Sequence, residues 1–203
     1  MIAIIDYGVG NLFSVEKAFV RLGADVVVTS DAGIIEKANK VVLPGVGAFG
    51  DCMKNLGASG LIPTIYAAIA AGKPLFGICV GLQILFEGSE ESPEAKGLGI
   101  FKGQVKKINA AGLKIPHMGW NSLLLTEAKQ QIHLFANLPE TAYVYFVHSF
   151  HAVPEEPKII TAYTEYGQRL TAAIARDNIQ ATQFHPEKSG DIGLTILQNF
   201  IEG

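Results

Sequence analysis

The turn sequence Gly-Ile-Cys-Val-Gly at 77–81 constrains the fold of this chain most. An apolar run at 74–78 leads directly into Cys79, and a helical pattern follows at 81–86. Glycines on both sides of a cysteine let the backbone turn sharply between a strand and a helix, so that one side chain stands above the sheet. In such a turn the backbone N–H of Val80 faces the place where an oxyanion forms. A buried structural cysteine is the competing interpretation of this motif taken alone.

A second motif, Gln-Phe-His-Pro-Glu-Lys-Ser at 183–189, carries a histidine and a carboxylate around a proline. A cysteine nucleophile needs a base within hydrogen-bond reach and a third group that orients the base. Pro186 restricts His185 to an extended backbone, which can hold the imidazole and the Glu187 carboxylate on one side. We therefore predict a catalytic triad of Cys79, His185 and Glu187. For His185 alone, a surface or helix-capping histidine is the alternative.

Bulk properties are typical of a globular domain. The chain has 203 residues, of which 49% are hydrophobic and 17% charged, and this suits one domain over residues 1–203 with a sizeable core. The net charge of −3 offers no basic surface for nucleic acid. Cys52 and Cys79 have neither the spacing of metal ligands nor that of a disulfide framework, so we predict a reducing, cytoplasmic location and no metal. The segment 55–72 lacks charge, but glycines and a proline interrupt it, so we predict no membrane span.

Strand and helix patterns alternate through the first half of the chain, which favours a parallel sheet. We predict strands at 2–5, 25–29, 41–43 and 75–78, helices at 11–22 and 31–38, and a helical region at 51–71 that glycines and Pro63 interrupt. In the second half we predict strands at 99–108, 122–125, 142–147, 159–163, 172–176 and 179–183 and a helix at 192–201. The fold class is therefore α/β, with an open, mostly parallel sheet flanked by helices and an antiparallel extension. Strand ends at Asp6, Pro44, Cys79 and Phe184 are expected to meet at one edge, where open α/β sheets bind ligands.

At Cys79, His185 and Glu187 the chain resembles the class I, triad-type glutamine amidotransferases. Within that family five blocks are similar to those of glutaminase subunits of imidazole glycerol phosphate synthase. These blocks are Asp-Tyr-Gly-Val-Gly-Asn-Leu at 6–12, Pro-Gly-Val-Gly-Ala-Phe-Gly at 44–50, Pro-His-Met-Gly-Trp-Asn at 116–121, Tyr-Phe-Val-His-Ser at 145–149 and His-Pro-Glu-Lys-Ser at 185–189. The resemblance covers essentially the whole chain.

The resemblance implies a role for each matching residue. Cys79 is the expected nucleophile, His185 its base and then the acid that releases ammonia, and Glu187 the orienting group. The expected oxyanion and substrate-binding positions are Gly45, Val46, Gly47, Val80, Gln83, Glu91, Ser149 and Phe150. In the family, threonine or tyrosine is more frequent at the last two positions, which contact the substrate through their backbone. The resemblance implies no cofactor.

Several of these residues have a simpler interpretation. Gln83 could be a solvated helix residue, Glu91 belongs to a charged loop at 87–94, and Gly45 and Gly47 could be turn glycines. The remaining histidines have no ligand-like spacing, and we interpret them as structural or surface residues; they are His117, His133, His148 and His151. Cys52 is expected to pack or cap a helix.

The resemblance also implies a partner, a (β/α)₈-barrel cyclase subunit. The positions expected at that contact are Asn11, Trp120, Tyr145 and Lys188. Ammonia from glutamine would pass to the cyclase, which makes imidazole glycerol phosphate and an aminoimidazole carboxamide ribotide in histidine biosynthesis. Two alternatives remain open at this point. One is the glutaminase of pyridoxal phosphate synthase or of anthranilate synthase, and the other is a catalytically silent regulatory subunit on the same fold.

Overall fold

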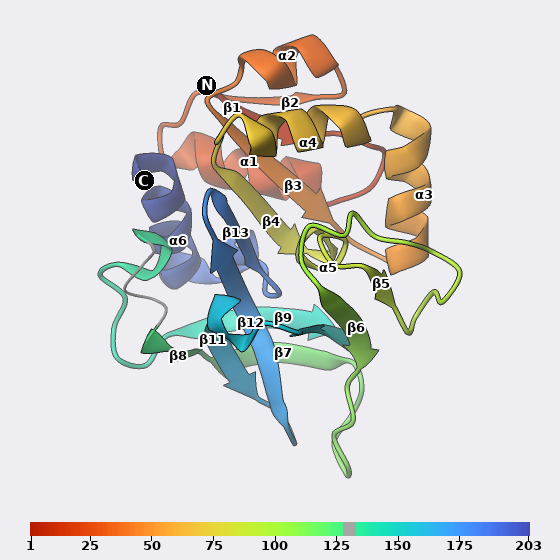
Figure 1. Ribbon diagram of the computed structural model, residues 1–203. Helices are drawn as coiled ribbons and strands as arrows, with labels where there is room; N and C mark the ends of the chain where they lie inside the picture. Colours follow the sequence, from red (N-terminus) through yellow and green to blue (C-terminus); the bar gives the residue numbers. More distant parts are fainter. Residues whose placement is uncertain (128–132) are drawn as a thin grey trace.

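Parallel strands form the centre of the computed structural model, which describes residues 1–127 and 133–203 (Figure 1). They lie in the order β2 (Val26–Thr29), β1 (Ile2–Ile5), β3 (Lys40–Gly45), β4 (Leu75–Cys79) and β13 (Ile179–Thr182). All neighbouring pairs in this series are parallel. Gly45 is in register with Cys79, so the carboxyl ends of β3 and β4 meet at one edge. The predicted convergence of strand ends is therefore confirmed for these two strands.

Helices cover both faces of the parallel strands (Figure 1). They are α1 (Leu12–Arg21), α2 (Ala32–Lys37), α3 (Phe49–Ser59), α4 (Ile62–Ala70) and α6 (Gly190–Glu202). Helix α1 packs against α6, whereas α4 packs against α2 and α3. The ring of Phe200 in α6 stacks on Phe76 in β4 at 5.0 Å and meets Phe19 in α1 edge-on at 6.3 Å. Burial of each such ring contributes about 1.5–3 kcal/mol, and the three fix both helices on the sheet.

An antiparallel extension follows β13 in the same sheet, as the sequence predicts. It consists of β12 (Arg169–Arg176), β11 (Ile160–Glu165) and β8 (Leu124–Leu125). The pairings β13 to β12, β12 to β11 and β11 to β8 are all antiparallel. The sheet is thus mostly parallel on the side of the nucleophile turn and antiparallel beyond β13.

Two small sheets stand apart from the main sheet, which differs from the prediction that all later strands extend it. One joins β10 (Phe150–Pro154), β6 (Gly103–Lys107) and β5 (Gly88–Ser89), and the other pairs β7 (His117–Ser122) with β9 (Tyr143–His148). The sequence does not predict β7, because its polar residues face the interior and its apolar residues face the solvent. The polar His117 is buried, while Met118 and Trp120 are exposed.

Two helical segments next to the parallel strands compare differently with their predictions. The interruption predicted within the helical region at 51–71 is confirmed, because α3 ends at Gly60 with a left-handed φ of 71° and α4 begins with Pro63 in its first turn. The helix after the nucleophile turn, α5 (Val80–Gln83), has four residues instead of the predicted six. The described residues include three short 3₁₀ helices, η2 (His133–Phe135), η3 (Pro157–Ile159) and η4 (Pro186–Lys188). Within the described ranges, no helix has the length and apolar character that a membrane span requires.

Candidate active site

Cys79 stands at a sharp turn between β4 and α5. Its backbone has φ 57° and ψ −111°, in the left-handed half of φ space that side chains other than glycine rarely enter. The neighbouring glycines are required by close contacts. A Cβ at Gly81 would lie 1.9 Å from the Leu43 carbonyl oxygen, and one at Gly77 would lie 2.9 Å from the Gly81 oxygen. The Gly-x-Cys-x-Gly pattern therefore has a steric cause, and the turn predicted from it is confirmed.

His185 and Glu187 form a buried pair directly after β13. His185 Nδ1 lies 2.8 Å from Glu187 Oε1, and their side chains are 3% and 1% exposed. The backbone of His185 is held on both sides, since its N–H donates to the Tyr145 carbonyl and its own carbonyl accepts from Ser189 Oγ at 2.6 Å. These contacts fix the imidazole relative to the carboxylate.

The electrostatics of this pair favour a charged imidazole. Burial by itself lowers the pKa of His185, but hydrogen bonding and charge interactions with Cys79 and Glu187 outweigh it and raise the pKa to about 10. The raised pKa favours the imidazolium form of His185, in which Nδ1 donates its proton to Glu187. A cationic imidazole beside a cysteine is an arrangement that activates the sulfur as a nucleophile.

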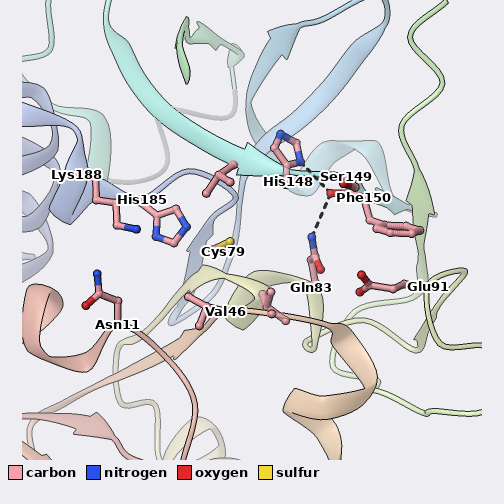
Figure 2. Close-up of a pocket in the computed structure, with 13 residues that line it drawn as sticks. Asn11, Val46, Cys79, Gln83, Glu91, His148, Ser149, Phe150, His185 and Lys188 are labelled. Atoms are coloured by element: carbon pink, nitrogen blue, oxygen red, sulfur yellow. Dashed lines mark hydrogen bonds between the residues drawn. The ribbon is translucent and has the colours of Figure 1, made fainter. Parts of the chain in front are cut away.

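Cys79 and His185 line one cavity of about 380 Å³ (Figure 2). Most of the positions predicted to bind substrate line it as well, namely Val46, Gly47, Val80, Gln83, Glu91, Ser149 and Phe150. Gly45 does not line the cavity; it packs against the nucleophile turn, where a Cβ would come within 2.8 Å of the Gly81 nitrogen. The structure thus brings together segments that follow β3, β4, β9 and β13.

Two buried donors hold the segment at 44–47, part of which lines the cavity. Tyr7 Oη donates to the Pro44 carbonyl at 2.6 Å, and Cys52 Sγ donates to the Val46 carbonyl at 3.3 Å. Burial raises the pKa of Cys52 to about 11, so its thiol stays protonated and keeps donating. Cys52 is fully buried in α3, which agrees with its predicted packing role. Sequence analysis missed the contact with Val46. The contact depends on how the chain turns between Val46 and the start of α3, and the sequence pattern does not indicate that turn.

Gln83 is a buried donor and not a solvated helix residue, with 3% of its surface exposed. Its Nε2 donates to the Phe150 carbonyl at 3.1 Å and to Gln183 Oε1 at 3.0 Å (Figure 2 marks the first contact). Gln183 Nε2 in turn lies 3.8 Å from Cys79 Sγ. Sequence analysis did not single out Gln183, although it stands two residues before His185 in the motif at 183–189.

Glu91 also has a defined place. Its Oε2 accepts from the backbone N–H of Phe49 at 2.8 Å, at the first residue of α3. A carboxylate is favoured there because the helix N-terminus carries unpaired N–H groups and a positive dipole end. Glu91 is therefore anchored at the wall of the cavity and does not belong to a merely solvated charge run.

The four residues predicted at a partner contact lie in two places. Asn11 and Lys188 line the cavity itself (Figure 2). Trp120 is 57% exposed and meets the Tyr145 ring edge-on at 6.3 Å, on the β7–β9 pair. A Cβ at Gly190 would lie 3.7 Å from the Trp120 ring, so this aromatic pair adjoins the start of α6.

Among residues 1–127 and 133–203, no group of three or more histidine, cysteine, aspartate or glutamate side chains is arranged to hold an ion.

Comparison with known proteins identifies the family. A family model described as glutamine amidotransferase class-I matches residues 3–202. The imidazole glycerol phosphate synthase subunit HisH of Methanothermobacter thermautotrophicus is 52% identical over 202 residues, covering 100% of this chain and 98% of the relative. The subunit of the same name from Geobacter metallireducens is 48% identical, covering 98% of this chain and 96% of the relative.

Solved structures show the same fold at lower identity. PurLQS from Thermotoga maritima has a TM-score of 0.74 at 19% identity, covering 99% of this chain and 97% of the other. The glutaminase domain of CTPS from Trypanosoma brucei has a TM-score of 0.62 at 16% identity, covering 99% and 93%. Three findings therefore indicate the same family: the fold, the match of the family model to residues 3–202, and relatives that are about 50% identical. This chain belongs to the class-I glutamine amidotransferase family.

Proposed function

We propose that this chain hydrolyses glutamine to glutamate and ammonia, with Cys79, His185 and Glu187 as its catalytic residues. The observation that carries the proposal is the strained Cys79 turn facing a buried His185–Glu187 pair across one cavity. The family assignment supports the same reaction class. The alternative of a catalytically silent regulatory subunit is set aside for another reason. All three reacting groups are present, and two of them, Cys79 and His185, line the same cavity.

The reaction follows from these groups. With its proton on His185, the Cys79 sulfur attacks the carboxamide carbon of glutamine and forms a tetrahedral oxyanion. As the oxyanion collapses to a thioester, His185 returns the proton to the departing nitrogen, which leaves as ammonia. His185 then takes a proton from water, the resulting hydroxide attacks the thioester, and glutamate leaves as the thiol is restored. Glu187 keeps the imidazole oriented and stabilises its cation throughout.

The remaining cavity residues would bind the substrate and the oxyanion. Preorganised backbone N–H groups at Val80 and in the segment at 45–47 would stabilise the oxyanion, and one such donor is worth about 2.7–4 kcal/mol. Gln83 and Glu91 would hold the polar groups of the glutamine. The backbone of Ser149 and Phe150 would complete the wall, so the departure from the family's usual side chains there has little effect on binding.

We further propose that the chain, as one domain over residues 1–203, is the glutaminase subunit of imidazole glycerol phosphate synthase. Relatives at 52% and 48% identity over nearly their full length carry that name, which favours it over the pyridoxal phosphate and anthranilate synthase alternatives. The partner would be a (β/α)₈-barrel cyclase that docks on Trp120, Tyr145, Asn11 and Lys188. It would use the ammonia to make imidazole glycerol phosphate and an aminoimidazole carboxamide ribotide. A cytoplasmic location accords with this biosynthetic role.

Replacement of the nucleophile tests the proposal. In the complex with the cyclase subunit, Cys79→Ala is expected to lower glutamine-dependent synthesis at least about 1000-fold, since removing one member of a catalytic triad costs that much or more. Synthesis from ammonium salt at high pH should persist, because free ammonia replaces the missing product. The measurement is product formation with each nitrogen source. Retained glutamine-dependent synthesis would contradict the role of Cys79.

The partner contact is tested separately. Trp120→Ala should weaken association with the cyclase, because truncation of an exposed aromatic anchor at an interface costs binding energy. Ammonia-dependent synthesis by the cyclase should not change. Unaltered association of this variant would remove Trp120 from the proposed interface.

A further inference from the structure

A continuous chain of hydrogen bonds runs from the β7–β9 pair to the glutamine cavity. Asn121 Nδ2 lies 3.2 Å from His117 Nε2, and His117 Nδ1 lies 2.9 Å from His148 Nε2. His148 Nδ1 lies 2.8 Å from the Phe150 carbonyl oxygen, which also accepts from Gln83 Nε2 at 3.1 Å. Two buried histidines outside the proposed triad thus connect the strand that carries Trp120 to a residue of the substrate site.

Strand register explains why these histidines meet. His117 in β7 is directly opposite His148 in β9. Opposite residues of an antiparallel pair project to the same face, so both imidazoles enter the interior together while Met118 and Trp120 project outward. The inverted pattern that hides β7 in the sequence is therefore the pattern that places His117 beside His148.

The hydrogen-bond partners determine which nitrogen of each ring carries the proton. A carbonyl oxygen only accepts, so His148 donates through Nδ1, and in a neutral ring its Nε2 must then accept. His117 must donate to that Nε2 through its own Nδ1. Its Nε2 then accepts from the Asn121 amide. Both rings are neutral in this arrangement, and both are protonated on Nδ1.

Burial keeps both rings neutral. It lowers the pKa of His117 to about 4 and that of His148 to about 3. The His117 ring is also stacked between Phe146 at 4.8 Å and Tyr166 at 4.2 Å, so it cannot turn without displacing a neighbour. Both rings are thus neutral, and the His117 ring is fixed by its neighbours. The pair can therefore hold the groups at its two ends in place without transferring a proton between them.

We propose that His117 and His148 are positioning residues for glutamine binding: they hold the Phe150 carbonyl, and through it Gln83, from the strand pair that carries the partner surface. The proposal rests on the proposed function, because it requires glutamine in this cavity. His148 lines the cavity, yet both of its ring nitrogens are occupied by protein groups. Its contribution is therefore to fix the backbone wall and not to react.

The protonation pattern can be read directly. The measurement is the NMR chemical shift of each imidazole nitrogen in protein labelled with ¹⁵N-histidine. At pH 7 the shifts of His117 and His148 are expected to be those of neutral rings protonated on Nδ1. The measurement uses the unaltered protein and needs no activity. A cationic ring, or a proton on Nε2 of either residue, would overturn the proposal.

Kinetics of the complex supply the second test. His148→Leu removes the donor to the Phe150 carbonyl and is expected to raise KM for glutamine roughly tenfold, the factor that corresponds to about 1.4 kcal/mol. The change in kcat should stay within about threefold, because the lost contact acts equally before and during the reaction. His148→Asn places an amide N–H near the former Nδ1 and should recover most of the lost affinity.

His151 is the matched control. It is also a buried histidine, 8% exposed against 6% for His148, and it follows Phe150 directly in β10. His151→Leu should leave KM for glutamine unchanged if the donor to Phe150, and not general packing, matters. Equal KM values for His148→Leu and the unaltered protein, or an equal loss in His151→Leu, would overturn the positioning role. If the unaltered complex did not hydrolyse glutamine at all, the proposed function itself would fail, so the two failures are distinguishable.

Discussion

The molecule contains two pairs of hydrogen-bonded, buried side chains that include histidine, and the two pairs differ in charge. The His185–Glu187 pair follows β13 and joins an imidazole to a carboxylate at 2.8 Å. The His117–His148 pair spans β7 and β9 and joins two imidazoles at 2.9 Å. The pKa of His185 is raised to about 10, whereas those of His117 and His148 are lowered to about 4 and about 3.

The difference shows that burial alone does not decide what a histidine does. All three residues are nearly inaccessible, at 2% for His117 and His185 and 6% for His148. Burial lowers the pKa in each case, and only His185 has a carboxylate and a cysteine close enough to reverse the direction. One pair can therefore move protons, while the other is confined to a fixed, neutral role.

Removing the negative charge of Glu187 tests whether the carboxylate causes the difference in pKa between His185 and the other two histidines. Glu187→Gln should lower the rate of glutamine hydrolysis by about 100-fold or more, yet less than His185→Ala, because the orienting group assists a base that still acts without it. The same change should lower the pKa of His185, since the negative charge beside it disappears. Steady-state kinetics and NMR titration of the imidazole measure the two effects. An unchanged rate would remove Glu187 from the triad.

Stability as a function of pH should separate the two pairs. The folded pKa values of His117 and His148 lie below the usual 6.5, so their contribution is complete above about pH 6.5 and is lost as pH falls toward 4 and 3. The folded pKa of His185 is raised, so its contribution is complete below about pH 6.5 and is lost as pH rises toward 10.

The test compares free energies of unfolding of His148→Leu and the unaltered protein between pH 6.5 and pH 4. The variant should lose stability less steeply with falling pH, by up to about 1.4 kcal/mol per pH unit, which is the slope for one proton. His133→Gln changes an exposed histidine and serves as the control. Parallel curves for His148→Leu and the unaltered protein would show that the imidazole pair is not neutral by burial.

The smallest expected effect concerns the outer end of the neutral pair. Asn121→Ala removes the donor to His117 Nε2 but leaves the inner contacts of His148 in place. Because Asn121 is only partly buried, water can replace its amide, and KM for glutamine should rise about twofold. A tenfold rise would mean that the outer end controls the cavity as strongly as His148 does.

Local signals made much of the fold and the triad predictable. The strand at 2–5 and the turn at Cys79 were predicted because apolar runs and flanking glycines act over a few residues. His185 and Glu187 are two residues apart, so their pairing is also a local property. The helix break at Gly60 and Pro63 follows the same rule, because glycine and proline act on the backbone locally and the interruption was predicted from them.

Contacts between distant segments could not be predicted in this way. Gln183 reaches Cys79 across 104 positions of sequence, and Tyr7 reaches Pro44 across 37. His117 and His148 were interpreted as structural or surface residues because nothing in their spacing reveals that their strands pair in direct register. Such contacts depend on how sheets are assembled, which a single sequence does not state.

The left-handed backbone of Cys79 has a consequence for how this chain could change over time. A residue other than glycine in this region costs of order 1–3 kcal/mol, and the cost is borne so that the sulfur can be presented. Glycine adopts the same φ without that cost. A duplicate copy released from hydrolysis, but still selected to bind its partner, would gain stability by exchanging this cysteine for glycine. Loss of the nucleophile is thus a change that stability itself favours, and only selection for ammonia production opposes it.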